Sequence, residues 1–287
     1  QFEQLFMTLK AAYTAIPYYQ KTFSDYGVTP ESLKSPEDIE LFPLMDKEDI
    51  KANYNDLINP GIPKWRHLVT TTGGSTAAPM RFLHIKGLTR SKEKAFIYKG
   101  WSRVGYYPGM KIIQLRGRSV GSPDEGVYWE YEAIQNMLEM DSNYLTPEYL
   151  PRYIEAMKKF SAQFIVAFPS SIYQIAKYIR DEKVDFPPLK AIMLASENVY
   201  PWQRKMIEDV FECRIYSHYG HSEMLLLGME APDSHDLLFF PQYGFLEVLD
   251  QEDQPVKGVG NKGQLIGTSF HNELMPFIRY KTKDYCE

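Results

Sequence analysis

Apolar and polar residues follow two different patterns along this chain, a helical periodicity near the N-terminus and short apolar runs further on. Between Phe2 and Tyr13, apolar side chains recur every three to four residues, which is the spacing of a helix with one buried face. We expect residues 1–60 to be largely helical. Within them, residues 35–38 (Ser-Pro-Glu-Asp) and 46–49 (Asp-Lys-Glu-Asp) carry the capping and acidic side chains of helix starts.

From residue 67 onward, short apolar runs alternate with helical patterns. The apolar runs predict strands at residues 67–71, 81–84, 111–115, 163–167, 189–194 and 214–219. The helical patterns predict helices at residues 87–102, from Thr146 to about residue 161, at 170–179 and at 201–210. Strands and helices in this order, joined by short connections, predict a mostly parallel sheet covered by helices.

The sequence pattern changes after residue 240, where strand-like runs are no longer separated by helical patterns. Runs at 245–249, 264–268 and 277–280 read as strands separated by turns rich in Gly and Asp. The fold class is therefore α/β, in three parts. We expect a helical N-terminal segment at residues 1–66, an α/β core at 67–240 and a β-rich segment at 241–287.

Composition narrows the function without naming it. Hydrophobic residues make up 44% of the 287 positions, which is ample for a buried core. The net charge of −5 argues against a generic nucleic-acid surface. Cys213 and Cys286 suggest no disulfide framework, so a reducing compartment, the cytoplasm, is expected. No apolar run approaches the length of a membrane span, so no membrane partner is expected.

Residues 70–79, Thr-Thr-Thr-Gly-Gly-Ser-Thr-Ala-Ala-Pro, are the most informative segment. Gly lets the backbone approach a ligand closely, and free N–H groups with Thr and Ser hydroxyls can surround an anion. The alternative is an ordinary polar hairpin turn.

Two further polar segments follow predicted strands: 195–198 (Ala-Ser-Glu-Asn) and 218–223 (His-Tyr-Gly-His-Ser-Glu). Loops at the carboxyl ends of parallel strands share one edge of a sheet, where ligands bind. Taken singly, these residues have simpler interpretations, such as a helix cap at Ser196 or a solvated acid at Glu223. Cys213, His218 and His221 lie close in sequence, but their spacing matches no standard zinc pattern.

Three segments, in order, resemble the motifs of adenylate-forming enzymes. Residues 72–79 resemble their phosphate loop, and residues 219–223 (Tyr-Gly-His-Ser-Glu) their Tyr-Gly-x-Thr/Ser-Glu motif. Residues 276–284 (Pro-Phe-Ile-Arg-Tyr-Lys-Thr-Lys-Asp) resemble their Pro-Leu-Ile-Arg-Tyr-Arg-Thr-Gly-Asp motif. The nearest branch is the phenylacetate–CoA ligase group with its CapK-like proteins, and the likeness spans nearly the whole chain.

This resemblance implies a function. The chain would be the N-terminal core of an enzyme that activates a carboxylic acid, aryl or small acyl, with ATP. The acid becomes acyl-AMP with release of pyrophosphate, and the acyl group then passes to CoA or another thiol. ATP/AMP, Mg²⁺ and CoA are the implied cofactors. The implied partners are a small-molecule carboxylic acid and a nucleotide, with a homodimer as an open alternative for the assembly.

The resemblance also implies residue roles. Thr72, Gly74, Ser75 and Thr76 would hold the β- and γ-phosphates, and Glu223 would reach the Mg²⁺ that bridges them. Thr76 and Glu223 would be the catalytic residues. The remaining implied contacts are Ser196 and Glu197 beside the adenine, Tyr219 and Gly220 against the adenine or acyl end, Asp284 on the ribose hydroxyls, and Phe168, Pro169 and Ser170 around the acyl pocket.

The chain departs from the pattern of the group at three positions. Ala77 and Lys283 each stand where the motifs have Gly, and Lys281 stands where they have Arg. A C-terminal lid domain with the catalytic Lys normally follows the Asp284 motif, whereas this sequence ends at Glu287. We therefore expect weak nucleotide binding and poor adenylation. The alternative function is a nucleotide-binding, catalytically weak homologue in polysaccharide or secondary-metabolite assembly.

A third function class is disfavoured. A Rossmann oxidoreductase would need Gly-x-Gly-x-x-Gly after a strand with an acidic residue downstream, and the sequence has no such segment.

Overall fold

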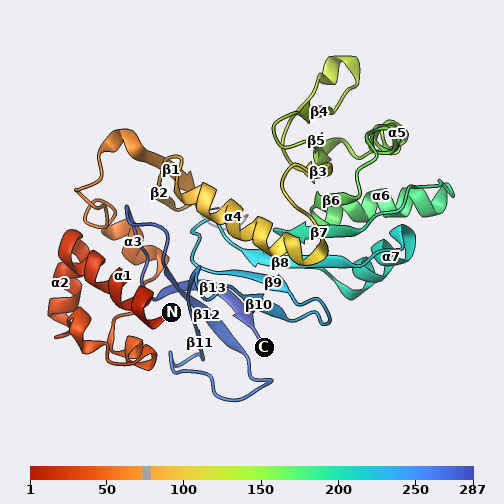
Figure 1. The fold of residues 1–287 in the computed structure, drawn as a ribbon. Helices are drawn as coiled ribbons and strands as arrows, with labels where there is room; N and C mark the ends of the chain where they lie inside the picture. Colours follow the sequence, from red (N-terminus) through yellow and green to blue (C-terminus); the bar gives the residue numbers. More distant parts are fainter. Residues whose placement is uncertain (73–78) are drawn as a thin grey trace. The chain divides into compact units, whose positions relative to one another are not determined.

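The computed structural model describes residues 1–72 and 79–287, and the chain divides into two compact units (Figure 1). Unit 1 consists of Gln1–Phe96, Gly220–Leu227 and Phe239–Glu287. Unit 2 consists of Ile97–Tyr219 and Gly228–Leu238. The three parts expected from the sequence, 1–66, 67–240 and 241–287, are continuous segments with different residue patterns. The two units are instead groups of residues that contact one another in space, so each combines segments far apart in the sequence.

Most of unit 2 is built on one large sheet. Within the part of the chain that the structure describes, the sheet has eight strands in the order β10-β9-β8-β7-β6-β3-β5-β4. Strands β3, β5, β6, β7 and β8 pair in parallel, and β4 pairs with β5 antiparallel. The strands are β3 (Ile112–Arg116), β4 (Trp129–Glu132), β5 (Met137–Asp141), β6 (Phe164–Ala167), β7 (Ala191–Ala195), β8 (Ile215–Gly220), β9 (Leu227–Glu230) and β10 (Leu237–Phe239). The α/β fold class predicted from the sequence is confirmed.

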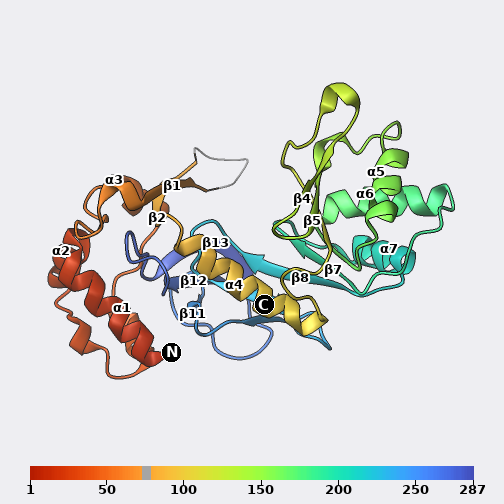
Figure 2. The same ribbon diagram turned by 45° about the horizontal axis from the view of Figure 1, so that its top comes forward.

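Both faces of this sheet are covered, because alternate residues of its strands belong to two different cores. Ile113, Ile165 and Ile192 join the core under helices α5 (Leu150–Phe160), α6 (Pro169–Asp181) and α7 (Pro201–Phe211). Ile112, Phe164 and Met193 join a second core with Trp101 at the end of α4 (Thr89–Trp101). Figures 1 and 2 show α5, α6 and α7 beside the strands from which this core comes. Burial on both faces explains why β6 and β7 read as continuous apolar runs.

Unit 1 combines the N-terminal helices with two small sheets. Its helices are α1 (Phe2–Ala15), α2 (Pro17–Asp25) and α3 (Lys47–Ala52), with 3₁₀ turns η1 (Pro30–Ser32), η2 (Pro36–Leu41) and η3 (Lys64–Arg66). Strands β1 (His67–Thr71) and β2 (Arg81–Ile85) form a hairpin. Strands β11 (Gly244–Leu249), β12 (Gly263–Ser269) and β13 (Tyr280–Cys286) form the second sheet. Both predicted helix starts are capped by a side chain, but the first opens a 3₁₀ turn rather than an α-helix.

Two sequence-based element boundaries are wrong. The helix expected from Thr146 begins at Leu150, because the carbonyl of Thr146 closes a turn that precedes it. The strand expected at 277–280 is displaced, since β13 begins only at Tyr280. Phe277 is buried, and the Tyr19 hydroxyl donates to the Pro276 carbonyl and accepts from the Ile278 amide. The Phe277 carbonyl accepts from the Ser269 amide of β12, but the regular pairing with β12 begins only at Tyr280.

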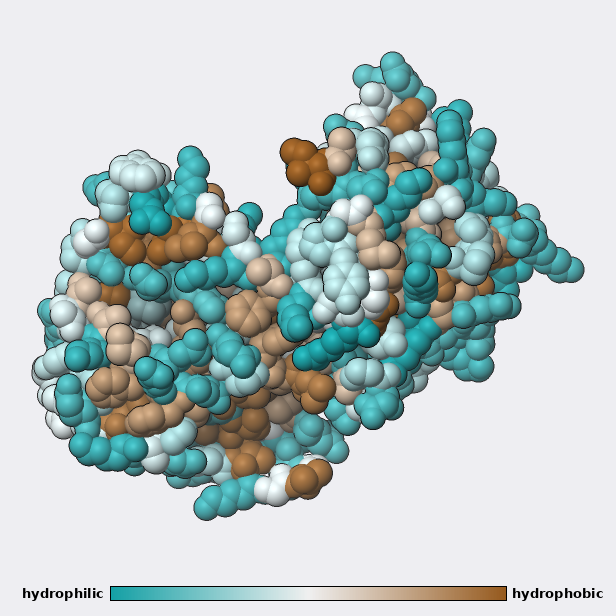
Figure 3. Space-filling view, viewed as in Figure 1, coloured by the Kyte–Doolittle hydropathy of each residue, from teal (hydrophilic) through white to brown (hydrophobic). Residues whose placement is uncertain are grey.

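In residues 1–72 and 79–287, none of the helices combines the length and the apolar composition needed to cross a bilayer. On the face shown in Figure 3, apolar side chains form small groups among polar ones.

Candidate active site

Thr72 closes the hairpin that carries the predicted phosphate loop. The β1–β2 register runs from His67↔Ile85 to Thr71↔Arg81. Beyond it, the Thr72 amide donates to the Met80 carbonyl at 2.9 Å, and the Thr72 hydroxyl accepts from the Met80 amide at 3.0 Å. Thr72 and Met80 therefore continue the antiparallel pairing of β1 and β2. The predicted phosphate ligands Gly74, Ser75 and Thr76, together with Ala77, lie outside the described residues.

Glu223 lies in a buried polar cluster of unit 1. Its side chain is 12% exposed, and its Oε2 is 3.3 Å from Nδ1 of His221. The Tyr280 hydroxyl, at the start of β13, also shares a hydrogen bond with Glu223. Lys47 is close enough for its charge to interact with this carboxylate, and the His84 imidazole also lies near it. The motif residue Glu223 thus meets the first strand residue of the third motif.

The Glu223 cluster favours an ionised carboxylate. Burial acts to raise the pKa of Glu223, but the His221 contact and the Lys47 charge outweigh it and hold the pKa below its usual value. The same proximity works in the opposite sense on Tyr280, where burial and Glu223 raise the pKa of the phenol. Burial and Arg90 lower the pKa of His84 to about 4, so this imidazole is neutral at pH 7. The cluster therefore presents one buried negative charge.

Arg279, in the third motif, has a structural role that the sequence reasoning did not assign. Its guanidinium makes hydrogen bonds of 2.7–3.1 Å to both Glu247 oxygens and also donates to the carbonyls of Glu40 and Phe42. Arg279 and Glu247 side chains are only 5% and 8% exposed. This buried fork ties the motif to β11 and to the N-terminal segment, and so holds the start of β13 beside Glu223.

A bulge in β13 sets the position of Asp284. Gln264 pairs with Tyr285 and Ile266 with Lys281, so one residue of β12 faces three of β13. Lys283, within the bulge, has φ +65°, and the Thr282 hydroxyl accepts the Asp284 amide at 3.1 Å. Asp284 itself is exposed on this strand. A bulge of this kind re-aims the side chain that follows it.

Replacing Lys283 with glycine should stabilise the chain. A non-Gly residue in the left-handed region costs roughly 1–2 kcal/mol, and part of that gain is offset by the extra freedom of glycine when unfolded. We expect the free energy of unfolding to rise by about 0.5–1 kcal/mol, measured by urea denaturation. Lys283→Val, which is β-branched, should lower it. A glycine variant less stable than the parent would contradict the strain assigned to this bulge.

In unit 2, Glu197 has a partner that its predicted role did not anticipate. Its two carboxylate oxygens accept the amide and the hydroxyl of Ser170, each at 2.9 Å. Ser170 lies in the first turn of α6, so Glu197 also satisfies a helix N-terminus. Ser196, the residue before it, has φ +70°. The contact joins the end of β7 to the predicted acyl-pocket segment 168–170.

Tyr219 and Arg116 complete the carboxyl edge of the unit 2 sheet. Tyr219 follows His218, which pairs with Ala195 at the end of β7. Arg116, the last residue of β3, has its guanidinium carbon 5.8 Å from the centre of the Phe168 ring. The parallel strands thus bring the ends of β3, β6, β7 and β8 to one edge, as predicted for a ligand site in an open parallel sheet.

Backbone strain marks the same motifs. Ser196, Met224, Arg279 and Lys283 all have positive φ without being glycine, at 70°, 55°, 51° and 65°. Each lies in, or directly after, one of the predicted site segments. Positive φ at Ser161 and Glu212, by contrast, belongs to helix C-termini. Asn136, Lys183 and Asp253 also have positive φ outside these segments, so positive φ accompanies the motifs without being confined to them.

The side chains of unit 1 fit a Mg²⁺ that arrives with nucleotide phosphates. Mg²⁺ takes one or two carboxylates and fills its remaining positions with phosphate oxygens and water. Glu223 supplies one ionised carboxylate. Across residues 1–72 and 79–287, no three His, Cys, Asp or Glu side chains gather as ligands for one ion, so most ligands would come from the nucleotide and water.

The structure therefore groups part of the predicted site. Unit 1 holds Thr72, Gly220, Glu223 and Asp284, with Glu223 in contact with the strand that carries Asp284. Unit 2 holds Ser196, Glu197 and Tyr219 at one sheet edge. Tyr280 lies in the third motif, but the sequence analysis assigns it no role. Its position directly after Arg279 in that motif was the one feature of the sequence that could have indicated one.

Comparison with known proteins agrees with the resemblance seen in the sequence. No protein-family model matches the chain. It is 28% identical to "Protein CapK" of Staphylococcus aureus over 87% of this chain and 54% of that protein. It is 24% identical to a phenylacetate-coenzyme A ligase of Pseudomonas putida over 99% of this chain and 65% of the ligase. The chain thus spans between half and two thirds of the length of these two relatives.

The fold has close counterparts among solved structures. One is an open conformation of 2-hydroxyisobutyryl-CoA ligase in complex with 2-HIB-AMP and CoA. It superposes with a TM-score of 0.75 at 19% identity, covering 99% of this chain and 68% of that one. The fold expected from the motifs, that of the core of an adenylate-forming ligase, is confirmed, and so is the similarity to phenylacetate–CoA ligases and CapK.

Proposed function

We propose that this chain binds ATP and a carboxylic acid as the core of an AMP-forming acid–thiol ligase similar to phenylacetate–CoA ligase. In the first step, a carboxylate oxygen of the acid attacks the α-phosphorus of ATP. The bond from that phosphorus to the β-phosphate oxygen breaks, giving acyl-AMP and pyrophosphate. In the second step, the thiol of CoA attacks the acyl carbon, the acyl–phosphate bond breaks, AMP leaves and the thiol proton passes to solvent.

One observation carries this proposal. Glu223 is a buried, ionised carboxylate in contact with Tyr280, the first residue of the strand that carries Asp284. The His221 contact and the Lys47 charge keep this carboxylate ionised despite its burial, so it can serve as a hard oxygen ligand at neutral pH. Such a ligand suits the Mg²⁺ of Mg·ATP.

The remaining roles follow from position. Asp284, exposed after the β13 bulge, can accept two hydrogen bonds from the vicinal hydroxyls of ribose. Thr72 belongs to the motif proposed to bind the phosphates, where hydrogen-bond donors would stabilise the charge that develops on them. Tyr219, at the edge of the unit 2 sheet, offers a ring for the adenine or the acyl end.

The cellular setting is part of the proposal. Mg²⁺ enters with ATP, and CoA is the second substrate. Cys213 and Cys286 are both free thiols, which suits the reducing cytoplasm where CoA is available. We expect no nucleic acid to bind.

The test is pyrophosphate release with a panel of carboxylic acids. We expect slow release, in keeping with the departures at Ala77, Lys281 and Lys283, that depends on both ATP and the acid, with aryl acids such as phenylacetate among the best. A parallel titration uses phenylacetyl-sulfamoyl-adenosine, a stable mimic of the acyl-AMP. Failure of every acid, together with failure to bind this mimic, would refute the proposal. Tight binding of the mimic with no release would instead favour the nucleotide-binding, catalytically weak alternative.

A further inference from the structure

The N-terminal segment of unit 1 is bonded directly to the third motif. The Met45 amide donates to the Arg279 carbonyl at 3.0 Å, and the Lys281 amide donates to the Met45 carbonyl at 2.9 Å. These two bonds form a parallel bridge between Met45 and Tyr280. Because the Tyr280 hydroxyl shares a hydrogen bond with Glu223, residue 45 lies beside the residue that contacts this carboxylate.

Further bonds fix the chain just before this bridge. The buried Tyr19 hydroxyl donates to the Pro276 carbonyl at 2.6 Å and accepts from the Ile278 amide at 3.2 Å. The Asn59 amide donates to the Leu274 carbonyl at 2.8 Å. The N-terminal segment therefore holds residues 274–281 at several points, and the chain that follows Met45 has a defined position beside the start of β13.

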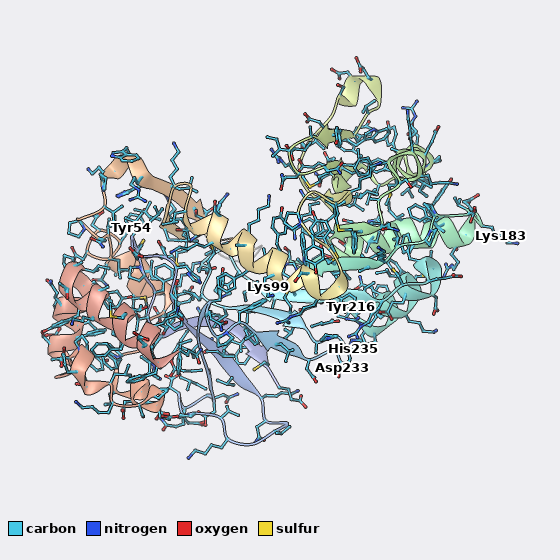
Figure 4. The ribbon with its side chains drawn as sticks, in the orientation of Figure 1. Tyr54, Lys99, Lys183, Tyr216, Asp233 and His235 are labelled. Carbon is cyan, nitrogen blue, oxygen red and sulfur yellow. The ribbon has the colours of Figure 1, made fainter. Side chains whose placement is uncertain are left out.

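Helix α3 begins at this point, and Lys47 is its first residue. The neighbouring carboxylates are bonded to backbone amides: Asp46 accepts from the Glu48 and Asp49 amides at 2.8 and 2.9 Å, and Asp49 accepts from the Asp46 amide at 2.9 Å. Figures 1 and 2 show α3 beside the blue segment that leads into β13, and Figure 4 labels Tyr54, two residues beyond the end of the helix.

Lys47 brings a positive charge to the Glu223 cluster without pairing with it. Its side chain is half-buried, and its charge acts on the Glu223 carboxylate. That carboxylate contacts His221 instead, at 3.3 Å. Among residues 1–72 and 79–287, none forms a hydrogen bond or an ion pair with the Lys47 ammonium group. A lysine and a carboxylate thus lie near each other, and the ammonium donors of the lysine are unused.

This arrangement suits a phosphate that binds a metal ion and a cation at the same time. Mg²⁺ binds oxygen ligands at about 2 Å and takes them from carboxylates, phosphates and water. An ammonium group donates to phosphate oxygens at about 2.8 Å and acts as a compact positive charge. A phosphate can therefore contact Mg²⁺ at Glu223 through one oxygen and Lys47 through another.

On these grounds, and resting on the proposed function, we infer that Lys47 binds the β- or γ-phosphate of ATP, the part that leaves as pyrophosphate. Mg²⁺ at Glu223 is proposed to bridge these same two phosphates, which selects them over the α-phosphate. The N-terminal segment then supplies a residue that touches the substrate. Its fixed cation stabilises the negative charge that accumulates on the leaving group.

The first test is titration calorimetry of the full chain with Mg·ATP, AMP and phenylacetyl-sulfamoyl-adenosine. Lys47→Met keeps the apolar stem of the side chain and removes its charge. We expect the affinity for Mg·ATP to fall about 10–100-fold, the scale of a lost hydrogen bond to a charged group. AMP and the acyl-AMP mimic carry no β- or γ-phosphate, so their affinities should stay within about twofold.

Two further variants serve as controls. Lys51→Met removes an exposed charge from the last turn of the same helix and should leave Mg·ATP binding within about twofold. Lys47→Arg keeps the charge and should recover part of the affinity. Thermal melting of each variant shows whether it is folded.

The second test separates direct phosphate binding from an effect that passes through Glu223. If Lys47 acts only by keeping Glu223 ionised, Lys47→Met has no further effect once Glu223 is Gln. Direct binding predicts that Lys47→Met still weakens Mg·ATP several-fold in the Glu223→Gln variant. This double-mutant comparison has a readout that a structural role does not produce.

The outcomes distinguish this inference from the proposed function. If the parent chain binds none of the three ligands, the proposed function itself fails. If the mimic binds and Lys47→Met has the parent's affinity for Mg·ATP, the role of Lys47 is overturned. Equal losses for Mg·ATP, AMP and the mimic, or no further loss in the Glu223→Gln variant, would also overturn direct phosphate binding.

Discussion

Glu223→Gln should reduce acid-dependent pyrophosphate release about 100-fold, the scale on which single electrostatic contacts to a transition state act. Glutamine keeps the size of the side chain and a hydrogen-bonding oxygen, but it loses the negative charge. The buried carboxylate that contacts His221 and Tyr280 is the only feature removed. Release should be measured at saturating acid over a range of Mg·ATP concentrations.

Glu48→Gln is the matched control for this prediction. Glu48 lies in the same unit on α3, and its carboxylate is 64% exposed and 4.0 Å from Lys283. It should leave release within a factor of about two, because exposed ion pairs contribute little. Equal loss in both variants, or no loss in Glu223→Gln, would remove Glu223 from the catalytic site.

Arg279→Ala should destabilise unit 1 by about 3–5 kcal/mol, the cost of leaving one partner of a buried ion pair uncompensated. Glu247 would keep a buried charge without its fork, and the carbonyls of Glu40 and Phe42 would lose a donor. Urea denaturation followed by the near-ultraviolet signal of the tyrosines measures this loss. Arg279→Lys should recover only part of it, since lysine lacks the planar fork.

Lys205→Ala provides the comparison for an exposed ion pair. Lys205 and Asp209 are 2.9 Å apart on α7, with side chains 78% and 62% exposed. Its removal should change the free energy of unfolding by less than about 0.5 kcal/mol. If Arg279→Ala costs no more than this control, the motif arginine is not the anchor described here.

Strong local patterns allowed much of the fold to be predicted. The apolar runs at β6 and β7 are buried on both faces, so their sequence shows an unbroken hydrophobic signal. The hairpin strands were placed within one residue of their observed bounds, since turn residues separate them. The helix at α4 and the capped start of α3 were also found from local signals alone.

Strands whose burial depends on long-range partners escaped prediction. β5 is buried throughout yet carries Glu139 and Asp141, which interrupt its apolar run. Glu139 is tolerated because Gln114, on β3, and Arg118 bond to it across the sheet. β13 was misplaced for a similar reason: its polar residues face solvent, and only pairing with β12 makes it a strand.

The candidate site, too, was predictable from the sequence where local motifs mark it and not where it depends on long-range contacts. Motif resemblance predicted the segments that contain Glu223 and Asp284, and the structure places Glu223 against the strand that carries Asp284. The Ser170–Glu197 contact links the first turn of α6 to the segment after β7, 27 positions apart in the sequence, and no local pattern encodes a contact at that separation. The departure at Lys283 gains a physical meaning only from its φ of +65°, which explains the glycine of the related motif.

The central claim is that Glu223 and Asp284 hold different parts of one nucleotide. Calorimetric titration of the chain with AMP and with Mg·ATP, repeated on Glu223→Gln and Asp284→Ala, tests it most directly. We expect Asp284→Ala to weaken both ligands about 10-fold or more, the scale of lost hydrogen bonds to a charged group, and Glu223→Gln to weaken only Mg·ATP. Unchanged affinity for both nucleotides in both variants would contradict the account.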